Sequence, residues 1–144
     1  IRHNIEGQRL IVVDDSIVRG TTTRAIVVML RSAGAAEVHV RISSPPYRWP
    51  CFYGMDTGTK AELLAANLTM DEIREYLGVN SIAYLELDRL INATGAPGAG
   101  FCTACLNGQY PVEIPANIGR DVLGVREDDQ GSAFISVSQM ELGQ

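Results

Sequence analysis

The spacing of apolar positions near the start of the chain predicts a strand followed by a helix. Residues 8–13 end in an uninterrupted apolar run, which indicates a strand buried on both faces, as in a parallel sheet. The helix is expected to begin near Thr21 or Thr22, either of which can cap its first turn, and to end at Gly34. Its expected core-facing residues recur at helical spacing: Ala25, Ile26, Met29, Leu30 and Ala33.

A second strand is predicted at residues 37–42, where Val38, Val40 and Ile42 alternate with polar residues and so indicate one solvated face. A strand, a helix and a strand joined by short links form a right-handed parallel crossover. We therefore expect an α/β fold with a parallel, doubly wound sheet. Residues 14–22 would then lie at the carboxyl end of a strand, where such sheets bind ligands.

The rest of the chain predicts a second, less regular part. Residues 43–59 carry three prolines and are expected to be irregular. Thr69 and Glu72 have the spacing of a capping box, which predicts a helix that ends at Gly78. A strand at residues 81–85, a helix at 86–93 and a peripheral tail, mobile at 126–132, are expected to follow. We divide the chain into a core unit, residues 1–58, and a C-terminal helical and loop-rich extension with a Cys-x-x-Cys pair, residues 59–144.

Composition limits the classes of function. The chain has 144 residues and a net charge of -5, and this acidic balance argues against a nucleic-acid partner. It contains no stretch of roughly 20 apolar residues, so we expect no membrane span. With no signal peptide visible, we expect a cytoplasmic protein. Because the chain lacks an initiator Met and starts almost at once with a core strand, we interpret it as a piece of a longer protein.

The clearest candidate chemistry follows the first predicted strand. Asp14 and Asp15 can accept hydrogen bonds from ribose hydroxyls or hold Mg²⁺. The loop at residues 16–22 can direct several backbone N–H groups at one phosphate, helped by the positive end of the following helix. The simpler interpretation is a pair of strand-end acids before a capped helix. The combination of a buried strand, paired acids, a glycine loop and threonines favours a site for a phosphorylated sugar.

These residues also resemble a known family. Residues 12–22 look like the phosphoribosylpyrophosphate (PRPP) signature of type I phosphoribosyltransferases. In the form Ser-Ile-Val-Arg-Gly-Thr-Thr they are similar to the glutamine PRPP amidotransferase (amidophosphoribosyltransferase) family. Four later stretches resemble that family too: Ser44-Pro45-Pro46, residues 49–56, Tyr84-Leu85 and Phe101-Cys102-Thr103-Ala104-Cys105. The resemblance covers roughly residues 6–115 and implies a partial type I phosphoribosyltransferase fold.

The resemblance implies a reaction and a set of site residues. The family makes 5-phosphoribosylamine, the first committed step of purine synthesis, from PRPP and glutamine-derived ammonia, and releases pyrophosphate. Asp14 and Asp15 would contact the ribose and share in binding Mg²⁺. Arg19 is expected either to anchor the substrate or to pair with an acid. The 5′-phosphate would be bound by Ser16, Ile17, Val18, Arg19, Gly20, Thr21 and Thr22.

The resemblance also implies what this chain lacks. The family's glutaminase domain and pyrophosphate-binding loop would lie outside it. We therefore assign no catalytic residue here and expect the chain alone to be inactive, whereas the longer protein is expected to be a homo-oligomer.

The three cysteines, Cys51, Cys102 and Cys105, suggest a metal site. From the residues alone, three buried thiols, a Zn²⁺ site and an iron–sulfur cluster all remain open. A redox pair is less favoured, because Cys102 and Cys105 lie in a glycine-flanked loop rather than at a helix start. The resemblance implies a structural [4Fe–4S] cluster, as in one branch of the family, with its fourth cysteine upstream of Ile1.

One alternative belongs to a different class of protein. Non-enzymes with the phosphoribosyltransferase fold bind PRPP to control transcription, so the chain could be a PRPP-binding regulatory module. The cysteines favour the enzyme.

Overall fold

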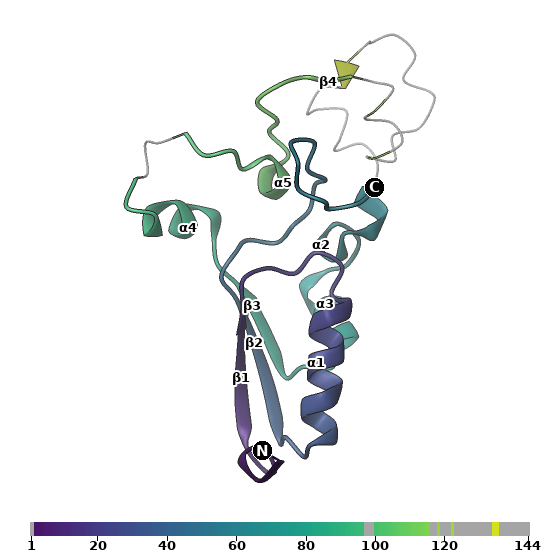
Figure 1. Cartoon of the computed structure of the whole chain (residues 1–144), viewed down its shortest axis with the longest axis vertical. Coiled ribbons are helices and arrows are strands. Elements are labelled where there is room, and N and C mark those ends of the chain that lie inside the picture. The colour runs from purple at the N-terminus through teal and green to yellow at the C-terminus, as the bar shows by residue number, and fades with distance from the viewer. Residues whose placement is uncertain (1, 97–99, 116–117, 119–121, 123–133, 136–144) are drawn as a thin grey trace.

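The computed structural model describes residues 2–96, 100–115, 118, 122 and 134–135, and Figure 1 shows the arrangement of its elements. In chain order these are the 3₁₀ turn η1 (Arg2–Asn4), β1 (Arg9–Asp14), α1 (Thr21–Ser32), β2 (Glu37–Ile42), the 3₁₀ turn η2 (Lys60–Glu62), α2 (Leu64–Asn67), α3 (Met70–Leu77), β3 (Ser81–Tyr84), α4 (Leu87–Ala93), α5 (Ala104–Asn107), β4 (Ile114–Pro115) and β5 (Phe134–Ile135).

The main sheet has three parallel strands in the order β1-β2-β3. Leu10 lies opposite Val38, and Val40 lies opposite Ile82. This arrangement confirms the predicted α/β fold with a parallel sheet. Because β3 lies in the predicted extension and pairs with β2 of the predicted core unit, the two parts of the chain share one sheet.

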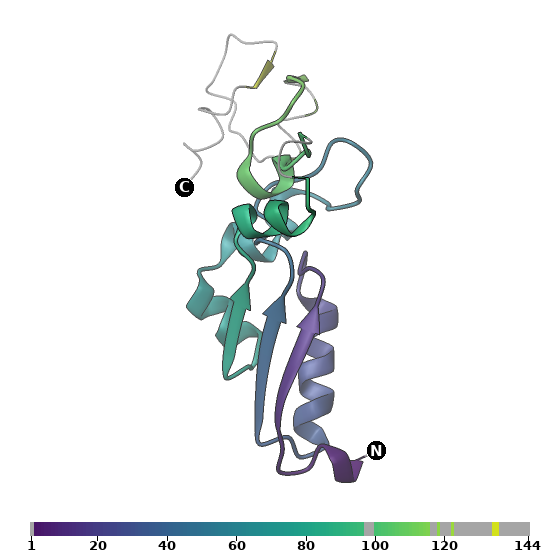
Figure 2. The same cartoon turned by 90° about the vertical axis from the view of Figure 1, so that its left-hand side faces the viewer.

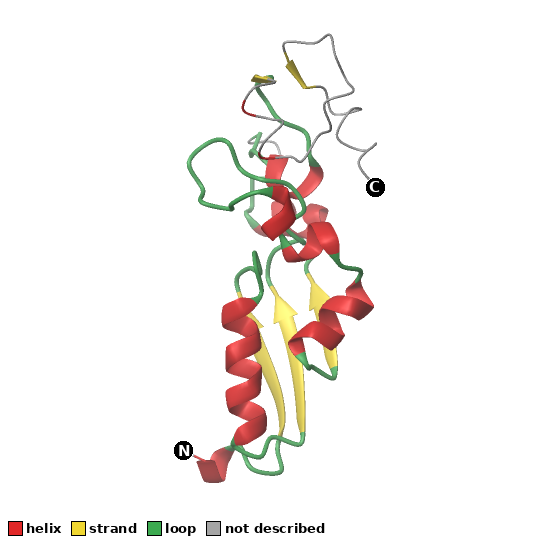
Figure 3. Cartoon of the chain, turned by 90° about the vertical axis from the view of Figure 1, so that its right-hand side faces the viewer, coloured by secondary structure: helices red, strands yellow, loops and turns green. Residues whose placement is uncertain are grey.

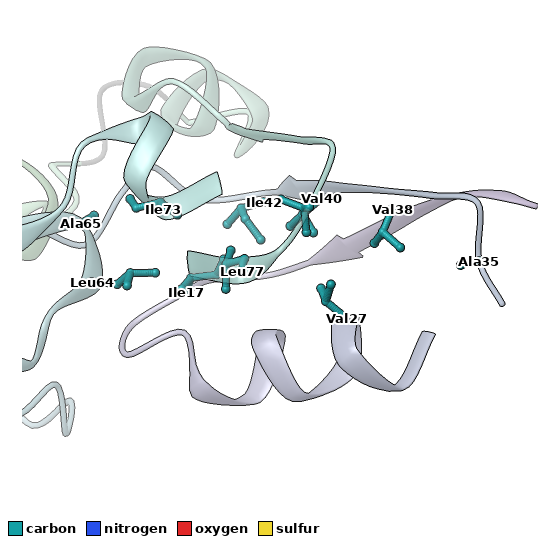
Figure 4. Close-up of a cluster of buried hydrophobic side chains, with 11 residues drawn as sticks. Ile17, Val27, Ala35, Val38, Val40, Ile42, Leu64, Ala65, Ile73 and Leu77 are labelled. Atoms are coloured by element: carbon teal, nitrogen blue, oxygen red, sulfur yellow. The ribbon is translucent and has the colours of Figure 1, made fainter. Parts of the chain in front are cut away.

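The hydrophobic core lies on one face of this sheet, beneath α1 and α3, which Figures 1 and 3 show on the same side. The alternation predicted for β2 is confirmed, since Val38, Val40 and Ile42 are buried. Figure 4 shows these side chains meeting those of the two helices and of the connecting segment. The buried cluster is Ile17, Val27, Ala35, Val38, Val40, Ile42, Leu64, Ala65, Ile73, Leu77 and Val79.

The prediction that the first strand is buried on both faces is wrong for the described residues. Ile11 is 68% exposed and Val13 is 72% exposed. Both helices that flank the sheet cover the opposite face, and Figure 2 shows the face of β1 and β2 without a helix over it. In addition β1 is an edge strand of the described sheet. The apolar run at residues 10–13 therefore includes two side chains that lie exposed on the open face of the sheet.

Helix α1 also departs from its prediction. Its N-cap is Gly20, in the left-handed region with φ of 76°, and no side chain caps the helix. Thr21 and Thr22 lie inside the first turn, past the position from which a hydroxyl can cap. The fully buried residues of the helix are Thr23 and Val27. Leu30, expected in the core, packs against it partly buried, whereas Met29, also expected there, is 60% exposed.

The remaining elements largely follow the sequence. The capping box of Thr69 and Glu72 is present, and α3 ends at Gly78 with φ of 70°. Residues 43–59 form neither helix nor strand, as predicted. The Cys-x-x-Cys pair differs, because residues 104–107 form the short helix α5 rather than a loop.

Two further findings concern the second half of the chain. The strands β4 and β5 pair antiparallel, and residues 126–132, predicted to be mobile, lie outside the described residues. None of the helices in the described ranges is both long and apolar enough to cross a membrane.

Candidate functional site

The carboxyl end of β1 opens onto a cavity of about 340 Å³, lined by residues 14–23. These are the end of the strand, the whole loop and the first turn of α1. The segment that the sequence singled out therefore curls around one space. Every residue predicted to bind the sugar or its phosphate lines that space.

The two acids stand at the start of this segment. Asp14 is half-buried, and its backbone carbonyl accepts hydrogen bonds from the amide of Ser43 at 3.0 Å and from its hydroxyl at 3.1 Å. The carboxylate of Asp14 accepts from the amide of Asp15 at 3.0 Å. Asp15 is exposed, and its carboxylate accepts from the Ser16 hydroxyl at 3.2 Å. The neighbouring strand thus fixes the backbone of Asp14, and both carboxylates keep oxygens free to accept bonds from sugar hydroxyls.

The loop is held against the segment that precedes α3. Ile17 is only 2% exposed and belongs to the hydrophobic core, so this residue offers a ligand its backbone rather than its side chain. The carbonyl of Val18 accepts from the amide of Leu64 at 2.9 Å. A Cβ on Gly20 would lie 2.8 Å from Leu64 Cδ2 and 3.3 Å from Tyr76 Cε1. Glycine is required at position 20 both by this close packing and by its positive φ.

The start of α1 suits an anion. No side chain caps it, and its first turn carries no acidic residue. The first N–H groups of a helix have no partner within the helix, and the helix dipole adds positive potential there. Thr21 and Thr22 were expected to cap the helix, but they line the cavity instead, so the N–H groups of this turn are available to a phosphate.

Arg19 does not stand alone in the loop. Its Nε donates to Oε2 of Glu62 at 2.8 Å. Glu62 also accepts from the backbone amide of Thr59, and these bonds lower the pKa of its carboxyl, the Thr59 amide having the larger effect and Arg19 the next. Glu62 was not among the residues predicted for the site. The available signal was the spacing of Thr59 and Glu62, which matches a capping box and forms one here.

The cysteines gather near a second loop. The amide of Cys51 donates to the Thr57 hydroxyl at 2.7 Å, and the amides of Arg48 and Trp49 both donate to the Cys105 carbonyl at 3.1 Å. Burial raises the pKa of the Cys105 thiol, and negative charge on Cys51 and, to a smaller extent, on Cys102 raises it further. The start of α5, which carries Cys105, is therefore held by hydrogen bonds to the loop that carries Cys51.

Aromatic side chains connect the residues around α5 to the loop that carries Cys51. The Tyr110 hydroxyl donates to the Pro50 carbonyl at 2.6 Å, and its ring meets that of Phe52 edge-on at 5.2 Å. Lys60 Nζ lies 4.3 Å from the centre of the Trp49 ring. A Cβ on Gly108 would approach that ring to 2.9 Å. The residues around α5 are thus packed onto the loop that carries Cys51.

The residues present fit the two expected metals to different degrees. Carboxylate oxygens suit Mg²⁺, which protein sites hold through one or two carboxylates together with water and substrate phosphates. Thiolates suit an iron–sulfur cluster. Across the part of the chain that the structure describes, however, no three His, Cys, Asp or Glu side chains form a ready-made metal-binding group.

The chain was compared with family models, curated proteins and solved structures. No family model matches the chain. The amidophosphoribosyltransferase of Synechococcus elongatus is 53% identical over 119 residues, which are 83% of this chain and 24% of that protein.

Two solved structures are similar. The first is the glutamine phosphoribosylpyrophosphate amidotransferase of B. subtilis complexed with ADP and GMP, with a TM-score of 0.71 and 49% identity over 77% of this chain and 25% of that one. The second is described as the allosteric regulatory enzyme of purine biosynthesis, with a TM-score of 0.73 and 50% identity over 79% of this chain and 25% of that one. This chain is therefore a homologue of the amidophosphoribosyltransferases over a segment equal to about a quarter of their length.

Proposed function

We propose that this chain is the ribose-phosphate-binding part of an amidophosphoribosyltransferase, which makes 5-phosphoribosylamine from PRPP and glutamine-derived ammonia. The observation that carries the proposal is the cavity at residues 14–23, which combines two adjacent carboxylates with an uncapped helix start. The 46–53% identity to enzymes of that name supports the same conclusion.

Each part of the cavity has a role in this proposal. The carboxylates of Asp14 and Asp15 accept hydrogen bonds from the two ribose hydroxyls and fix the ring. The amides of residues 16–22 and the hydroxyls of Thr21 and Thr22 donate to the 5′-phosphate. As pyrophosphate leaves C1, positive charge develops on the ring, and the nearby carboxylates stabilise it. Asp14 and Asp15 would also help to hold Mg²⁺ together with the substrate, and the ion would supply positive charge to the pyrophosphate group.

The proposal is tested by titrating the ¹⁵N-labelled chain with PRPP and MgCl₂. We expect the amide signals of residues 14–22 to shift, and we expect the double variant Asp14→Asn, Asp15→Asn to bind much more weakly. Asp88→Asn, an acid in the first turn of α4, serves as the matched control and should bind like the unmodified chain. Signals at residues 14–22 that stay unchanged at saturating PRPP would overturn the assignment.

We also propose that Cys51, Cys102 and Cys105 are three ligands of a [4Fe–4S] cluster, which places the protein in the iron–sulfur branch of the family. The donor chemistry of thiolates supports this, and so do the hydrogen bonds that hold the Cys105 carbonyl against Arg48 and Trp49 in the loop that carries Cys51. Such a cluster takes four cysteines, so the fourth would come from outside this chain, which has three. The cluster would tie the segment around α5 to the Cys51 loop.

The cluster is tested by metal analysis of the longer protein, purified without air. We expect a brown protein with iron and acid-labile sulfide in equal amounts, which loses stability when exposed to oxygen. A colourless protein that contains zinc, or no metal, would contradict the cluster. Because Cys51 is a proposed ligand, Cys51→Ser should lower the iron content.

A further inference from the structure

We propose that Glu62 is a positioning residue for the phosphate-binding loop, and that it acts through Arg19. The inference rests on the proposed function, because the loop at residues 16–22 is taken as the 5′-phosphate site. Glu62 lies outside the cavity, which is lined by residues 14–23 alone. It therefore affects the ligand only by holding the loop.

The carboxylate of Glu62 is held from two sides. Its Oε2 accepts from Arg19 Nε at 2.8 Å. Its Oε1 accepts from the amide of Thr59 at 3.0 Å and from the Thr59 hydroxyl at 3.2 Å. Both oxygens are engaged, so the orientation of the carboxylate is fixed by the turn on which it lies. A fixed carboxylate can in turn fix the arginine.

The backbone beneath the pair leaves room for it. At Gly58 the φ is 68°, and a Cβ would lie 2.7 Å from Arg19 Nη2 and 2.7 Å from Glu62 Oε1. Any other residue at this position would push the two side chains away. The absence of a side chain at Gly58 thus lets the backbone pass close to the ion pair.

The ion pair acts together with two other contacts on consecutive loop residues. The carbonyl of Val18 accepts from the Leu64 amide, Arg19 binds Glu62, and Gly20 packs against Leu64. Several amides of the loop must point at one phosphate at the same time. Fixing their backbone before the ligand arrives lowers the entropy lost on binding.

The chain offers a matched control for this role. Glu72 forms the same capping box with Thr69, and its Oε2 accepts from the Thr69 amide at 2.8 Å and from the hydroxyl at 2.8 Å. No loop arginine binds Glu72. Comparing Glu62→Gln with Glu72→Gln therefore separates the effect on the loop from the loss of a cap.

The experiment uses the full 144-residue chain, with PRPP and MgCl₂ as the probe. Loss of one exposed ion pair should loosen the loop only modestly, so we expect Glu62→Gln to bind PRPP about three- to five-fold more weakly. Glu72→Gln should bind like the unmodified chain. In an Arg19→Gln background, Glu62→Gln should have no further effect, because the partner is already gone. Amide exchange of residues 18–20 without ligand should be faster in Glu62→Gln alone.

The outcomes separate the two proposals. If the unmodified chain does not bind PRPP, the proposed function fails. Faster amide exchange confined to Glu62→Gln would still support the positioning role of Glu62. If the chain binds and Glu62→Gln matches Glu72→Gln in affinity and exchange, the positioning role fails. If Arg19 instead contacts the phosphate directly, removing the competing carboxylate would strengthen binding, and this opposite sign would also overturn the inference.

Discussion

At the scale of single residues, two tyrosines differ in one hydrogen bond. Burial raises the pKa of Tyr84 to about 12, and its buried hydroxyl has no partner among the described residues. Burial also raises the pKa of Tyr110, but its hydroxyl donates to the Pro50 carbonyl. An unsatisfied buried hydroxyl destabilises, whereas a satisfied one contributes about 1 kcal/mol.

We therefore expect opposite results when each hydroxyl is removed. Tyr84→Phe should leave the free energy of unfolding unchanged or raise it by about 1 kcal/mol, and Tyr110→Phe should lower it by about 1 kcal/mol. Urea denaturation followed by circular dichroism measures both. A clear loss of stability in Tyr84→Phe would show that its hydroxyl has a partner in solution.

Glu72 makes the stability of α3 depend on pH. The hydrogen bonds from the Thr69 amide and then from its hydroxyl lower the pKa of the Glu72 carboxyl below its ordinary value of 4.5. A carboxyl whose pKa is lowered by folding stabilises the protein above the unfolded pKa, and this contribution is lost as the pH falls through the folded pKa. The capping box should therefore be intact from pH 7 to about pH 5 and should weaken below pH 4.5.

This is checked by measuring the urea midpoint of the chain and of Glu72→Gln at several pH values. Glutamine does not titrate, so the difference in midpoint between the two proteins should be largest near neutral pH. It should shrink as the pH falls below 4.5. A difference that stayed constant down to pH 3 would mean that ionisation of Glu72 does not contribute.

At the scale of elements, the segment around η2 contacts both candidate sites. Thr57 accepts from the amide of Cys51, and Lys60 lies over the Trp49 ring. Glu62 binds Arg19, and the Leu64 amide donates to the Val18 carbonyl in the loop at residues 16–22. A short turn without an extended helix or strand thus connects the cysteine loop to the cavity.

The matched glycines Gly58 and Gly78 test how tightly this segment is packed. Their φ values are 68° and 70°, but a Cβ at Gly78 would meet nothing within 4 Å, whereas one at Gly58 would strike Arg19 and Glu62. Gly78→Ala should lower the free energy of unfolding by about 1 kcal/mol, because an L side chain is strained at positive φ. Gly58→Ala should cost more and should shift the amide signal of Arg19. Equal losses in the two variants would show that the ion pair can move aside.

The elements that could be predicted are those that depend on nearby residues. The capping box of Thr69 and the alternation around Val40 are local patterns, and both are confirmed. The burial of Ile11 depends on what covers the second face of the sheet, which a strand pattern does not record. The N-cap is Gly20 rather than a threonine, at a place where Leu64 and Tyr76, both distant in sequence, leave no room for a Cβ.

The same distinction holds within the candidate site. The acids and the glycine of the cavity form one continuous run, so the sequence was enough to propose them together. Glu62 lies 43 positions from Arg19. The turn that it caps is three residues long, with no apolar periodicity to mark it. Only the folded structure brings Glu62 beside Arg19.

At the scale of the whole molecule, the two predicted parts of the chain build one core. Val27 and Val38 come from the first part, and Leu64, Ile73 and Leu77 come from the second. Because β3 completes the sheet beside β2, the elements after residue 58 support the strand whose end carries Asp14. The position of the cavity therefore depends on both parts.

The last prediction concerns what this chain does alone. The cavity supplies acids and amides, which suit a ribose and its 5′-phosphate, but beyond Mg²⁺ a leaving pyrophosphate needs cationic or N–H donors from the protein at its own oxygens. Among the described cations, Arg19 is paired with Glu62, Arg24 lies over the Tyr76 ring, and Lys60 lies over the Trp49 ring. We therefore expect the chain to bind PRPP without turning it over. With PRPP, MgCl₂ and ammonium chloride it should release pyrophosphate no faster than a protein-free mixture, and it should form no ammonia from glutamine. Pyrophosphate release that disappears in the Asp14→Asn, Asp15→Asn variant would instead mean that these 144 residues hold a working transferase site.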